Sequence, residues 1–313
     1  MLVPALLLAA GIALLYLGGE ALVGGATGLA RRLGMSSLVI GLTVVAFGTS
    51  APELAATLTA TLDGSPNLGL GNVVGSNIAN IGLILGISAL LVPLVTTTSF
   101  ILRELPFMIG CSALLFPLAG DDNISRFEGA SLCVLLLLYL GFLYWNDSVP
   151  EPDDDDDEEM PSLRKSLGLV ALGSVVLVGG AKLLVMGGVD LARDLGISER
   201  VIGLTMVAIG TSLPELASSL VAARKGETDL VLGNVVGSNV FNVLCILGVT
   251  SLVRPMDVDG TAAQPDLVFG LILSGLVIPF VWSGRRLGRG EGLTLLVLWL
   301  GYIVWLFVRG AGT

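Results

Sequence analysis

Histidine is absent from this 313-residue chain, and charged residues make up only 13% of it. Without histidine the chain lacks imidazole metal ligands and the commonest general base, which argues against most hydrolytic enzymes. A soluble domain carries roughly 25% charged residues, so an ordinary soluble domain is excluded. The three cysteines lie far apart in apolar stretches and show neither metal-ligand spacing nor a disulfide framework. We expect no catalytic residue and no cofactor.

Long hydrophobic segments fill most of the chain, which is 54% hydrophobic and has a mean hydropathy of +0.90. About 20 apolar residues suffice for a helix to cross the hydrocarbon core. The first segment is expected to be a spanning helix and not a cleaved signal peptide, because no positive region precedes it. An all-α integral membrane protein with ten transmembrane helices is therefore predicted, at residues 2–29, 37–62, 68–92, 99–119, 126–145, 166–192, 198–223, 228–252, 265–283 and 290–309.

One strongly acidic stretch, EPDDDDDEEMP at residues 151–161, divides the ten segments into two sets of five. A run of like charges between prolines is expected to stay solvated as a linker, although a cation-sensing or partner-binding tail is an alternative. We expect a first five-helix repeat at 1–145, a linker at 146–162 and a second repeat at 163–313. Because five is odd, the second repeat begins on the opposite side of the membrane, so the two should be inverted.

The basic residues indicate the orientation, since cytoplasmic loops carry an excess of lysine and arginine. If the N-terminus is outside, the inner loops hold Arg31, Arg32, Arg103, Arg164, Lys165, Arg224, Lys225, Arg285, Arg286 and Arg289. The outer segments then hold Arg126, Arg193, Arg200, Arg254 and Arg309. We therefore expect a multi-pass protein of the cell (inner) membrane with both termini outside and the acidic linker in the cytoplasm.

Two motifs occur twice, at the same separation of 162 residues. GLTVVAFGTSAPEL at 41–54 returns as GLTMVAIGTSLPEL at 203–216 with 11 of 14 positions identical, and GNVVGSN at 71–77 returns unchanged at 233–239. Each copy of the first motif places a glutamate, Glu53 or Glu215, in an apolar segment. A carboxylate at mid-membrane costs about 2.5–3.5 kcal/mol on insertion scales and is by default functional.

A proline precedes each of these glutamates by one residue. Pro52 and Pro214 lack an N–H, and their rings clash with the carbonyl four residues back, so each should open its helix. An opened turn within a membrane is tolerated only where protein or a water-filled cavity receives the freed groups. We expect the second and seventh helices to be broken at the centre of the molecule, with main-chain oxygens beside a glutamate.

Helical spacing gathers further oxygen-bearing side chains beside these breaks. One face holds Thr43, Ser50 and Glu53 in the first copy, and Thr205, Ser212 and Glu215 in the second. A polar stripe holds Asn72, Ser76 and Asn80, and its twin holds Asn234, Ser238 and Asn242; small residues beside each stripe indicate close helix packing. Such an oxygen-only set suits Ca²⁺, which takes about six to eight oxygens, or Na⁺ in smaller subsites.

These motifs resemble the α-repeats of the cation/Ca²⁺ exchanger superfamily, in particular its Na⁺/Ca²⁺ exchanger branch. The resemblance covers both five-helix sets. It implies antiport of three Na⁺ for one Ca²⁺ by alternating access, with the first and sixth helices sliding across the other eight. We expect Ca²⁺, Na⁺ and the lipid bilayer as partners, no nucleic acid, and a monomeric functional unit.

The resemblance also implies roles for individual residues. Glu53 and Glu215 would be the acidic ligands shared by Ca²⁺ and Na⁺, and Asn80 and Asn242 would line the centre. Hydroxyls, largely for Na⁺, would come from Ser50, Ser76, Ser212 and Ser238. Main-chain carbonyls would come from Thr49 and Thr211 for Ca²⁺ and from Ala46 and Ala208 for flanking Na⁺. Some members carry Asp where this chain has Asn242, so two formal negative charges are expected here, not three, and exchange should depend weakly or not at all on K⁺.

Several alternatives remain open at this stage. An H⁺/Ca²⁺ or K⁺-dependent exchanger of the same superfamily would use the same glutamates, and a passive cation channel would need no counter-ion. A membrane enzyme is disfavoured because no nucleophile–base pair is evident. Glu20 and Lys182 occupy equivalent positions in the first and sixth segments, either near a gate or in structural pairs at helix ends.

Overall fold

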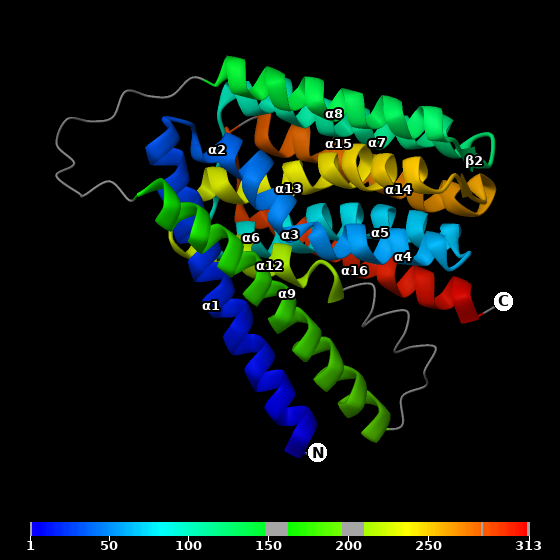
Figure 1. Cartoon of the computed structure of the whole chain (residues 1–313), viewed down its shortest axis with the longest axis horizontal. Coiled ribbons are helices and arrows are strands. Elements are labelled where there is room, and N and C mark those ends of the chain that lie inside the picture. The colour runs from blue at the N-terminus through cyan, green and yellow to red at the C-terminus, as the bar shows by residue number, and fades with distance from the viewer. Residues whose placement is uncertain (1, 148–161, 196–209, 283, 312–313) are drawn as a thin grey trace.

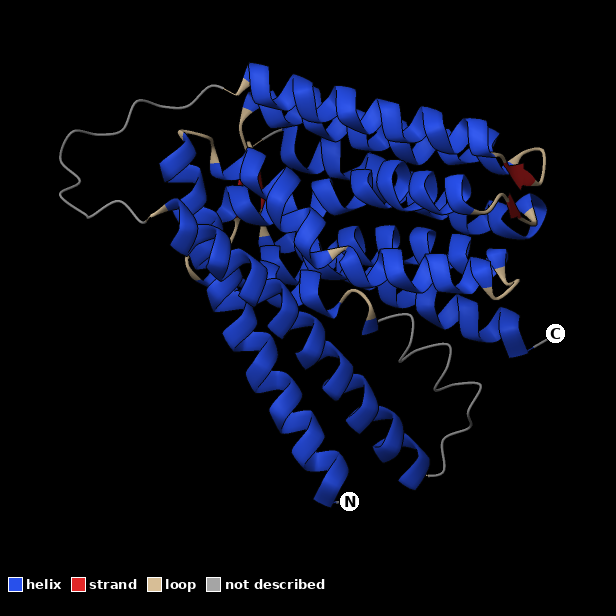
Figure 2. Ribbon diagram, in the orientation of Figure 1, coloured by secondary structure: helices blue, strands red, loops and turns tan. Residues whose placement is uncertain are grey.

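The computed structural model describes residues 2–147, 162–195, 210–282 and 284–311, and these residues are almost entirely helical (Figures 1 and 2). In the first half the elements are α1 (Leu2–Leu33), α2 (Ser37–Ile40), η1 (Gly41–Val45), α3 (Ala46–Thr49), α4 (Ala51–Leu62), α5 (Pro66–Ala79), η2 (Asn80–Leu85), α6 (Gly86–Leu91), β1 (Leu94–Val95), η3 (Phe100–Glu104), α7 (Leu105–Ala119), β2 (Asn123–Ile124) and α8 (Arg126–Asn146). In the second half they are α9 (Leu163–Asp194), α12 (Leu213–Arg224), α13 (Thr228–Phe241), η5 (Asn242–Leu247), α14 (Gly248–Val253), β3 (Met256–Asp257), α15 (Gly260–Trp282), β4 (Arg286–Leu287) and α16 (Arg289–Ala311). The η elements are π-helical turns.

Most of the ten predicted spans are present. Eight described helices are long and apolar enough to cross a membrane, and the bent pair Ser37–Thr49 and Ala51–Leu62 makes a ninth. The remaining prediction, 198–223, lies partly outside the described residues, which resume at 210 and show its second part as α12. The all-α membrane fold class is confirmed, and the predicted boundaries of the long helices differ from the observed ones by a few residues.

Two small antiparallel sheets show how the two halves are joined. β1 pairs with β4 and β2 pairs with β3, so each sheet takes one strand from each half. The segment from η3 to α7 leads from the first sheet to the second, while α15 leads from the second back to the first. Twenty helical residues span about 30 Å, so the sheets lie at opposite ends of these helices. Therefore α7 and α15 run in opposite directions, as inverted repeats require.

The most buried helices are the continuous segments Pro66–Leu91 and Thr228–Val253. In their most hydrophobic 18-residue stretches, 83% and 94% of residues are buried, against 28% in α1 and in α9. Both buried segments contain π-helical turns, which shift the backbone hydrogen-bond ladder from i−4 to i−5 and often occur at functional sites. The centre of the protein is therefore formed by the two segments that carry the G-N-V-V-G-S-N motifs.

Helices α1 and α9 lie side by side and slant away from the other helices (Figure 1). Glycines let their backbones touch: a Cβ on Gly18 would lie 2.8 Å from the main-chain nitrogen of Leu177, and one on Gly180 would lie 2.8 Å from that of Leu15. Residue numbers rise along one helix as they fall along the other, so the pair is antiparallel. These small residues permit close helix approach within a membrane.

Candidate cation site

Both glutamates lie in the first turn of a helix that begins at a break. Ser50 has φ −83° and ψ 4°, and Ser212 has φ −90° and ψ 6°, so the chain leaves helical geometry and restarts as α4 or α12. Helix axes bend by 46° at the first break. Pro52 and Pro214 fill early positions of the new helices, where a missing N–H leaves no bond unmade. The predicted break is confirmed at the first motif, and the second motif is described from Gly210 onward.

Each carboxylate is bound by a serine from the opposite half. Ser50 Oγ donates to Glu215 Oε1 at 3.1 Å, and Ser212 Oγ donates to Glu53 Oε1 at 3.3 Å. Both glutamates are 1% exposed. Their other oxygens, both named Oε2, have no hydrogen-bond partner among the described residues. The two halves therefore meet crosswise at the glutamates, and each carboxylate has one oxygen to spare.

Threonine and asparagine side chains support the breaks in the same crosswise manner. Thr49 Oγ1 is 3.2 Å from Asn234 Oδ1, and Thr211 Oγ1 is 3.4 Å from Asn72 Oδ1. The amide nitrogens of Asn72 and Asn234 donate at 3.4 Å to the main-chain oxygens of Glu53 and Glu215. The first residue of each polar stripe thus orients the break, a role that the sequence analysis did not assign to it.

The later residues of both stripes are buried, and one of them contacts a serine that binds a carboxylate. Ser212 Oγ, which donates to Glu53, is also 3.3 Å from Ser76 Oγ. Ser238 Oγ has no partner among the described residues, and neither do the side-chain oxygens of Asn80 and Asn242. These three residues are at most 1% exposed. Leaving a buried acceptor unsatisfied costs about 1–3 kcal/mol, so each of these oxygens calls for a ligand.

The remaining predicted ligands are placed less directly. The Ala46 carbonyl accepts the Ser50 N–H at 3.0 Å and the Thr49 hydroxyl at 3.3 Å, so a flanking ion would share it with these donors. Ala208 lies outside the described residues. Thr43, which was expected to share the face of Glu53, bonds its own helix, with Oγ1 2.7 Å from the Val39 carbonyl.

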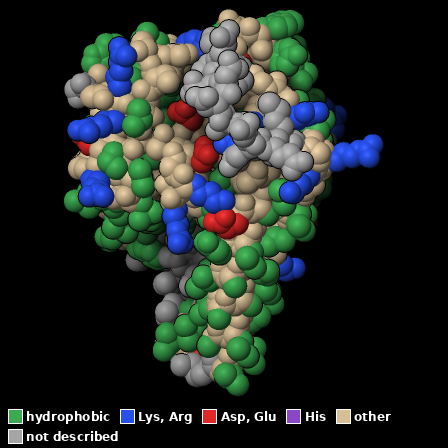
Figure 3. Space-filling view, turned by 90° about the vertical axis from the view of Figure 1, so that its left-hand side faces the viewer, with side chains coloured by type: hydrophobic (Ala, Val, Ile, Leu, Met, Phe, Trp, Pro, Cys, Tyr) green, Lys and Arg blue, Asp and Glu red, His purple; other side chains and the backbone are tan. Residues whose placement is uncertain are grey.

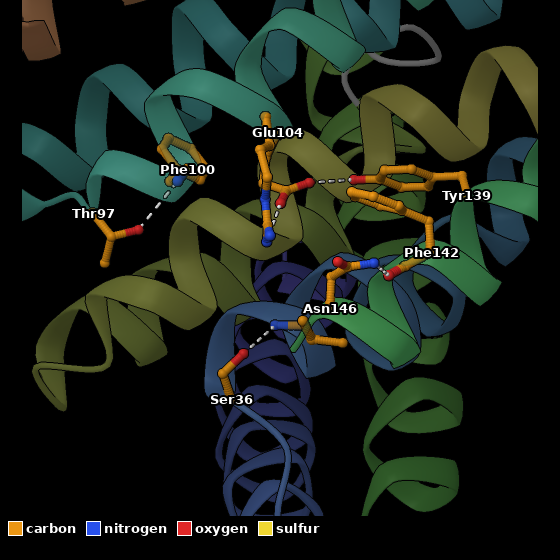
Figure 4. A network of polar contacts seen from close by, with 9 residues as sticks. Ser36, Thr97, Phe100, Glu104, Tyr139, Phe142 and Asn146 are labelled. Atoms are coloured by element: carbon orange, nitrogen blue, oxygen red, sulfur yellow. Dashed lines mark hydrogen bonds and ion pairs between the residues drawn. The ribbon is translucent and has the colours of Figure 1, made fainter. Parts of the chain in front are cut away.

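A third buried glutamate, Glu104, has a partner for each of its two carboxylate oxygens (Figure 4). Glu104 is 1% exposed, and its two oxygens are 3.2 Å from Arg103 Nη2 and 3.0 Å from Tyr139 Oη. The second half contains an equivalent acid–tyrosine pair, in which Tyr302 Oη lies 3.0 Å from Asp266 Oδ1. Tyr302 corresponds to Tyr139, and Asp266 corresponds to Glu104. The sequence analysis missed both pairs. Because Glu104 already has two partners, it lacks the unpaired oxygen that distinguishes Glu53 and Glu215.

The chemistry of the central set is that of a hard cation site. No described residue belongs to a cluster of three or more His, Cys, Asp and Glu, so the two carboxylates act with neutral oxygens. Within this central set, five of the buried oxygens that lack partners among the described residues belong to Glu53, Glu215, Asn80, Asn242 and Ser238. Carboxylate, amide and hydroxyl oxygens are the ligands that Ca²⁺ prefers. The arrangement provides two negative charges for a divalent ion.

Comparison with known proteins gives the family. Residues 3–145 and 165–308 match the family described as sodium/calcium exchanger protein. The chain is 40% identical to a candidate antiporter, CaxA, of Alkalimonas amylolytica, with 98% of the chain and 99% of that relative covered. It is 34% identical to the sodium/calcium exchanger MaX1 of Methanosarcina acetivorans, over 96% of the chain and 98% of MaX1.

A solved structure agrees with this assignment. The sodium–calcium exchanger NCX_Mj, studied with Na⁺ and without Ca²⁺, superposes with a TM-score of 0.82 at 35% identity, over 97% of this chain and 98% of that one. The likeness extends over both halves and both copies of the paired motifs. The chain is a multi-pass membrane protein and belongs to the sodium/calcium exchanger family.

Proposed function

We propose that this protein exchanges Na⁺ for Ca²⁺ by alternating access, with three Na⁺ for each Ca²⁺. One observation carries the proposal: two buried glutamates, each bound through one oxygen by a serine of the opposite half, leave their second oxygens unpaired. Two ionised carboxylates neutralise one Ca²⁺. Because Na⁺ needs the same carboxylates, one cargo must leave before the other binds, which is the physical basis of exchange.

The proposed ligands are the twelve residues of the sequence analysis. Glu53 and Glu215 bind both ions, and the remaining oxygens come from Thr49, Thr211, Ser50, Ser212, Ser76, Ser238, Asn80, Asn242, Ala46 and Ala208. Three Na⁺ against one Ca²⁺ moves one net charge in each cycle, worth about 2.3 kcal/mol per 100 mV. Transport should therefore respond to membrane potential.

The proposed units and orientation follow from the same arrangement. The halves 1–145 and 163–313 would act as inverted repeats, with 146–162 as a cytoplasmic linker and both termini outside an inner membrane. Figure 3 looks onto the end where α8 stops and α9 starts, and Lys and Arg side chains gather around this face while hydrophobic side chains cover the flanks. That distribution supports a cytoplasmic face.

Ion flux in proteoliposomes tests the proposal. An outward Na⁺ gradient at equal pH should drive Ca²⁺ uptake, and a positive-inside potential should speed it because three positive charges leave as two enter. Uptake that needs only a pH gradient would indicate H⁺/Ca²⁺ exchange instead. Ca²⁺ entry without any counter-ion would indicate a channel.

A further inference from the structure

Four asparagine side chains at the centre form one hydrogen-bonded group. Nδ2 of Asn77 donates to the main-chain oxygen of Asn239 at 3.4 Å, and Nδ2 of Asn239 donates to that of Asn77 at 3.4 Å. Nδ2 of Asn80 donates to Asn239 Oδ1 at 2.9 Å, and Nδ2 of Asn242 donates to Asn77 Oδ1 at 2.9 Å. All four are buried, with Asn77 the most exposed at 6%.

The order of these bonds determines which way each amide faces. A main-chain carbonyl only accepts, so it requires the NH₂ group of Asn77 or Asn239 to face it. The Oδ1 of that residue then faces the other way and accepts from Asn242 or Asn80. As a result Asn242 and Asn80 turn their NH₂ groups to this partner and keep their oxygens for another ligand. Those two oxygens are the ones that have no partner.

We propose that Asn77 and Asn239 are positioning residues, which hold Asn242 and Asn80 with their oxygens toward the transported cation. Without them, either amide could turn over and present N–H groups, which repel a cation. The inference rests on the proposed cation site, and it adds two residues that contact no ion themselves. Asn80 lies one helical turn after Ser76, whose hydroxyl reaches the Ser212 that binds Glu53, so the group adjoins the carboxylates.

The first test separates positioning from a general structural role. Asn77→Ala and Asn239→Ala should each raise the KM for Ca²⁺ by about tenfold or more, as is typical when a partner that orients a metal ligand is lost. The turnover number should change much less. A purely structural role would instead reduce the amount of folded protein and the maximal rate and leave the KM as it was, and that result would overturn the inference.

The second test uses a carboxylate, which presents an oxygen whichever way it is turned. In an Asn242→Asp background residue 242 no longer needs orienting, so adding Asn77→Ala should not raise the KM further. Adding Asn239→Ala to the same background is the matched control, and it should still raise the KM because Asn239 orients Asn80. In an Asn80→Asp background, Asn239→Ala should not raise the KM further, whereas Asn77→Ala should still raise it. Equal effects of Asn77→Ala in the wild-type and Asn242→Asp backgrounds would contradict the inference.

Failure of this inference is distinguishable from failure of the proposed exchange. If wild-type proteoliposomes show no Na⁺-driven Ca²⁺ uptake, the proposed exchange is wrong. The same variants are then compared by the concentration of Ca²⁺ that raises the unfolding temperature of the purified protein. In that measurement as well, Asn242→Asp should suppress the effect of Asn77→Ala, and Asn80→Asp should suppress that of Asn239→Ala. The absence of this pattern would overturn the positioning role.

A second inference rests on an ion pair between outer helices. Glu20 Oε2 of α1 is 2.6 Å from Nζ of Lys225, which follows α12. The residues at the equivalent positions of the other half are Lys182 and Asp63, with the two charges exchanged. Both are exposed, and among the described residues neither forms an ion pair. Of the two equivalent contacts between the halves, one is thus made and the other is not.

We also infer that Lys182 and Asp63 pair in the opposite conformation, when the pair of Glu20 and Lys225 has separated. Inverted repeats alternate when one repeat moves against the other, so a contact between the halves that is made in one state is expected of its equivalent residues in the alternate state. In the present structure α1 packs closely on α12, since a Cβ on Gly19 would lie 2.9 Å from Val221 Cγ2. The two ion pairs would then form alternately, each closing the protein toward one side of the membrane.

Cross-linking tests this second inference. In a background with Cys111, Cys133 and Cys245 replaced by Ala, cysteine pairs at positions 20 and 225 and at 63 and 182 are treated with a short bifunctional thiol reagent. Each pair should cross-link and stop transport, and a reducible reagent should restore it on reduction, which shows that the protein stayed folded. Cross-linking at 20 and 225 without any at 63 and 182, in the presence of either ion, would overturn the inference.

Discussion

Most polar contacts at the centre of the molecule occur twice, whereas the ion pair of the outer helices occurs once. At the centre, the bonds of Ser50 to Glu215 and of Ser212 to Glu53 are related by the 162-residue repeat. The threonine–asparagine contacts and the four-asparagine group repeat in the same way. On the outside, Glu20 binds Lys225, while Lys182 and Asp63 form no ion pair among the described residues.

This difference separates two tasks. A binding site built on the axis that relates the halves keeps its ligands in both conformations, because exchanging the halves leaves the axis in place. Contacts away from the axis change when the halves exchange. In the proposed mechanism the centre would determine which ion binds, and the outer helices would determine which side the site faces.

Removing one central charge should have the largest effect. Glu53→Gln and Glu215→Gln keep the side-chain volume but leave a single negative charge for a divalent ion. Breaking a buried charge pair costs about 3–5 kcal/mol, so Ca²⁺ affinity should fall by at least about 100-fold. Na⁺-driven Ca²⁺ uptake by purified protein measures this, and the repeat predicts equal losses for the two variants.

Glu104→Gln is the matched control for the charge removals. Glu104 is as buried as the central glutamates, but both of its oxygens are bound by Arg103 and Tyr139. This variant should lower the unfolding temperature while each folded molecule keeps its Ca²⁺ affinity. A loss of affinity as large as that of Glu53→Gln would show that burial, and not the unpaired oxygen, marks the site.

The serine variants should have a smaller effect. Ser50→Ala and Ser212→Ala each remove one hydrogen bond to a buried carboxylate, worth about 1.5–3 kcal/mol, so ion affinity should change by about 10- to 100-fold. Thr43→Val is the control, because Thr43 bonds only its own helix among the described residues. A change in Ca²⁺ affinity no larger than that of Thr43→Val would contradict the role of these two serines at the site.

Neutralising the outer ion pair should change little. Glu20 and Lys225 are 33% and 36% exposed, and an exposed pair contributes about 0.2–1 kcal/mol, so Glu20→Gln should shift the balance of conformations by at most about fivefold. The reaction of a cysteine at the site with a thiol label added on either side of the membrane measures the balance of conformations. Lys182→Gln should shift it in the opposite direction, and a shift in the same direction would contradict the alternating pairs.

Replacing K⁺ should have no effect at all. Asn242 and Asn80 are both neutral, so the site lacks a third negative charge for K⁺ to neutralise. Exchanging K⁺ for choline on both sides should leave Na⁺-driven Ca²⁺ uptake unchanged. A requirement for K⁺ would show that another acidic group, not identified at the centre, takes part.

Much of this arrangement could be predicted from the repeat. Repeated motifs 162 residues apart indicated two breaks and two buried glutamates, and five spans in each repeat indicated an inverted relation. The structure brings Ser50, Ser212 and both glutamates together. Hydrophobic length sufficed to place the long helices. These features depend on residue type and local spacing, which a sequence shows directly.

Other features depend on contacts that spacing does not reveal. The strands have two residues each, too few for a pattern, and a π-helical turn is only a change of hydrogen-bond register. Asn77 and Asn239 lie one residue off the i, i+4 polar stripes, so the spacing argument passed over them. Their repetition within an identical motif was the signal that could have identified them.

The most direct test of the central claim is Na⁺-gradient-driven uptake of radiolabelled Ca²⁺ by wild-type protein and Glu215→Gln in parallel proteoliposomes. We predict that the wild type takes up Ca²⁺ only with an outward Na⁺ gradient, at equal pH and without K⁺, and that Glu215→Gln takes up none above empty vesicles. Normal Na⁺-driven uptake by Glu215→Gln would contradict a site in which two carboxylates are shared between the ions.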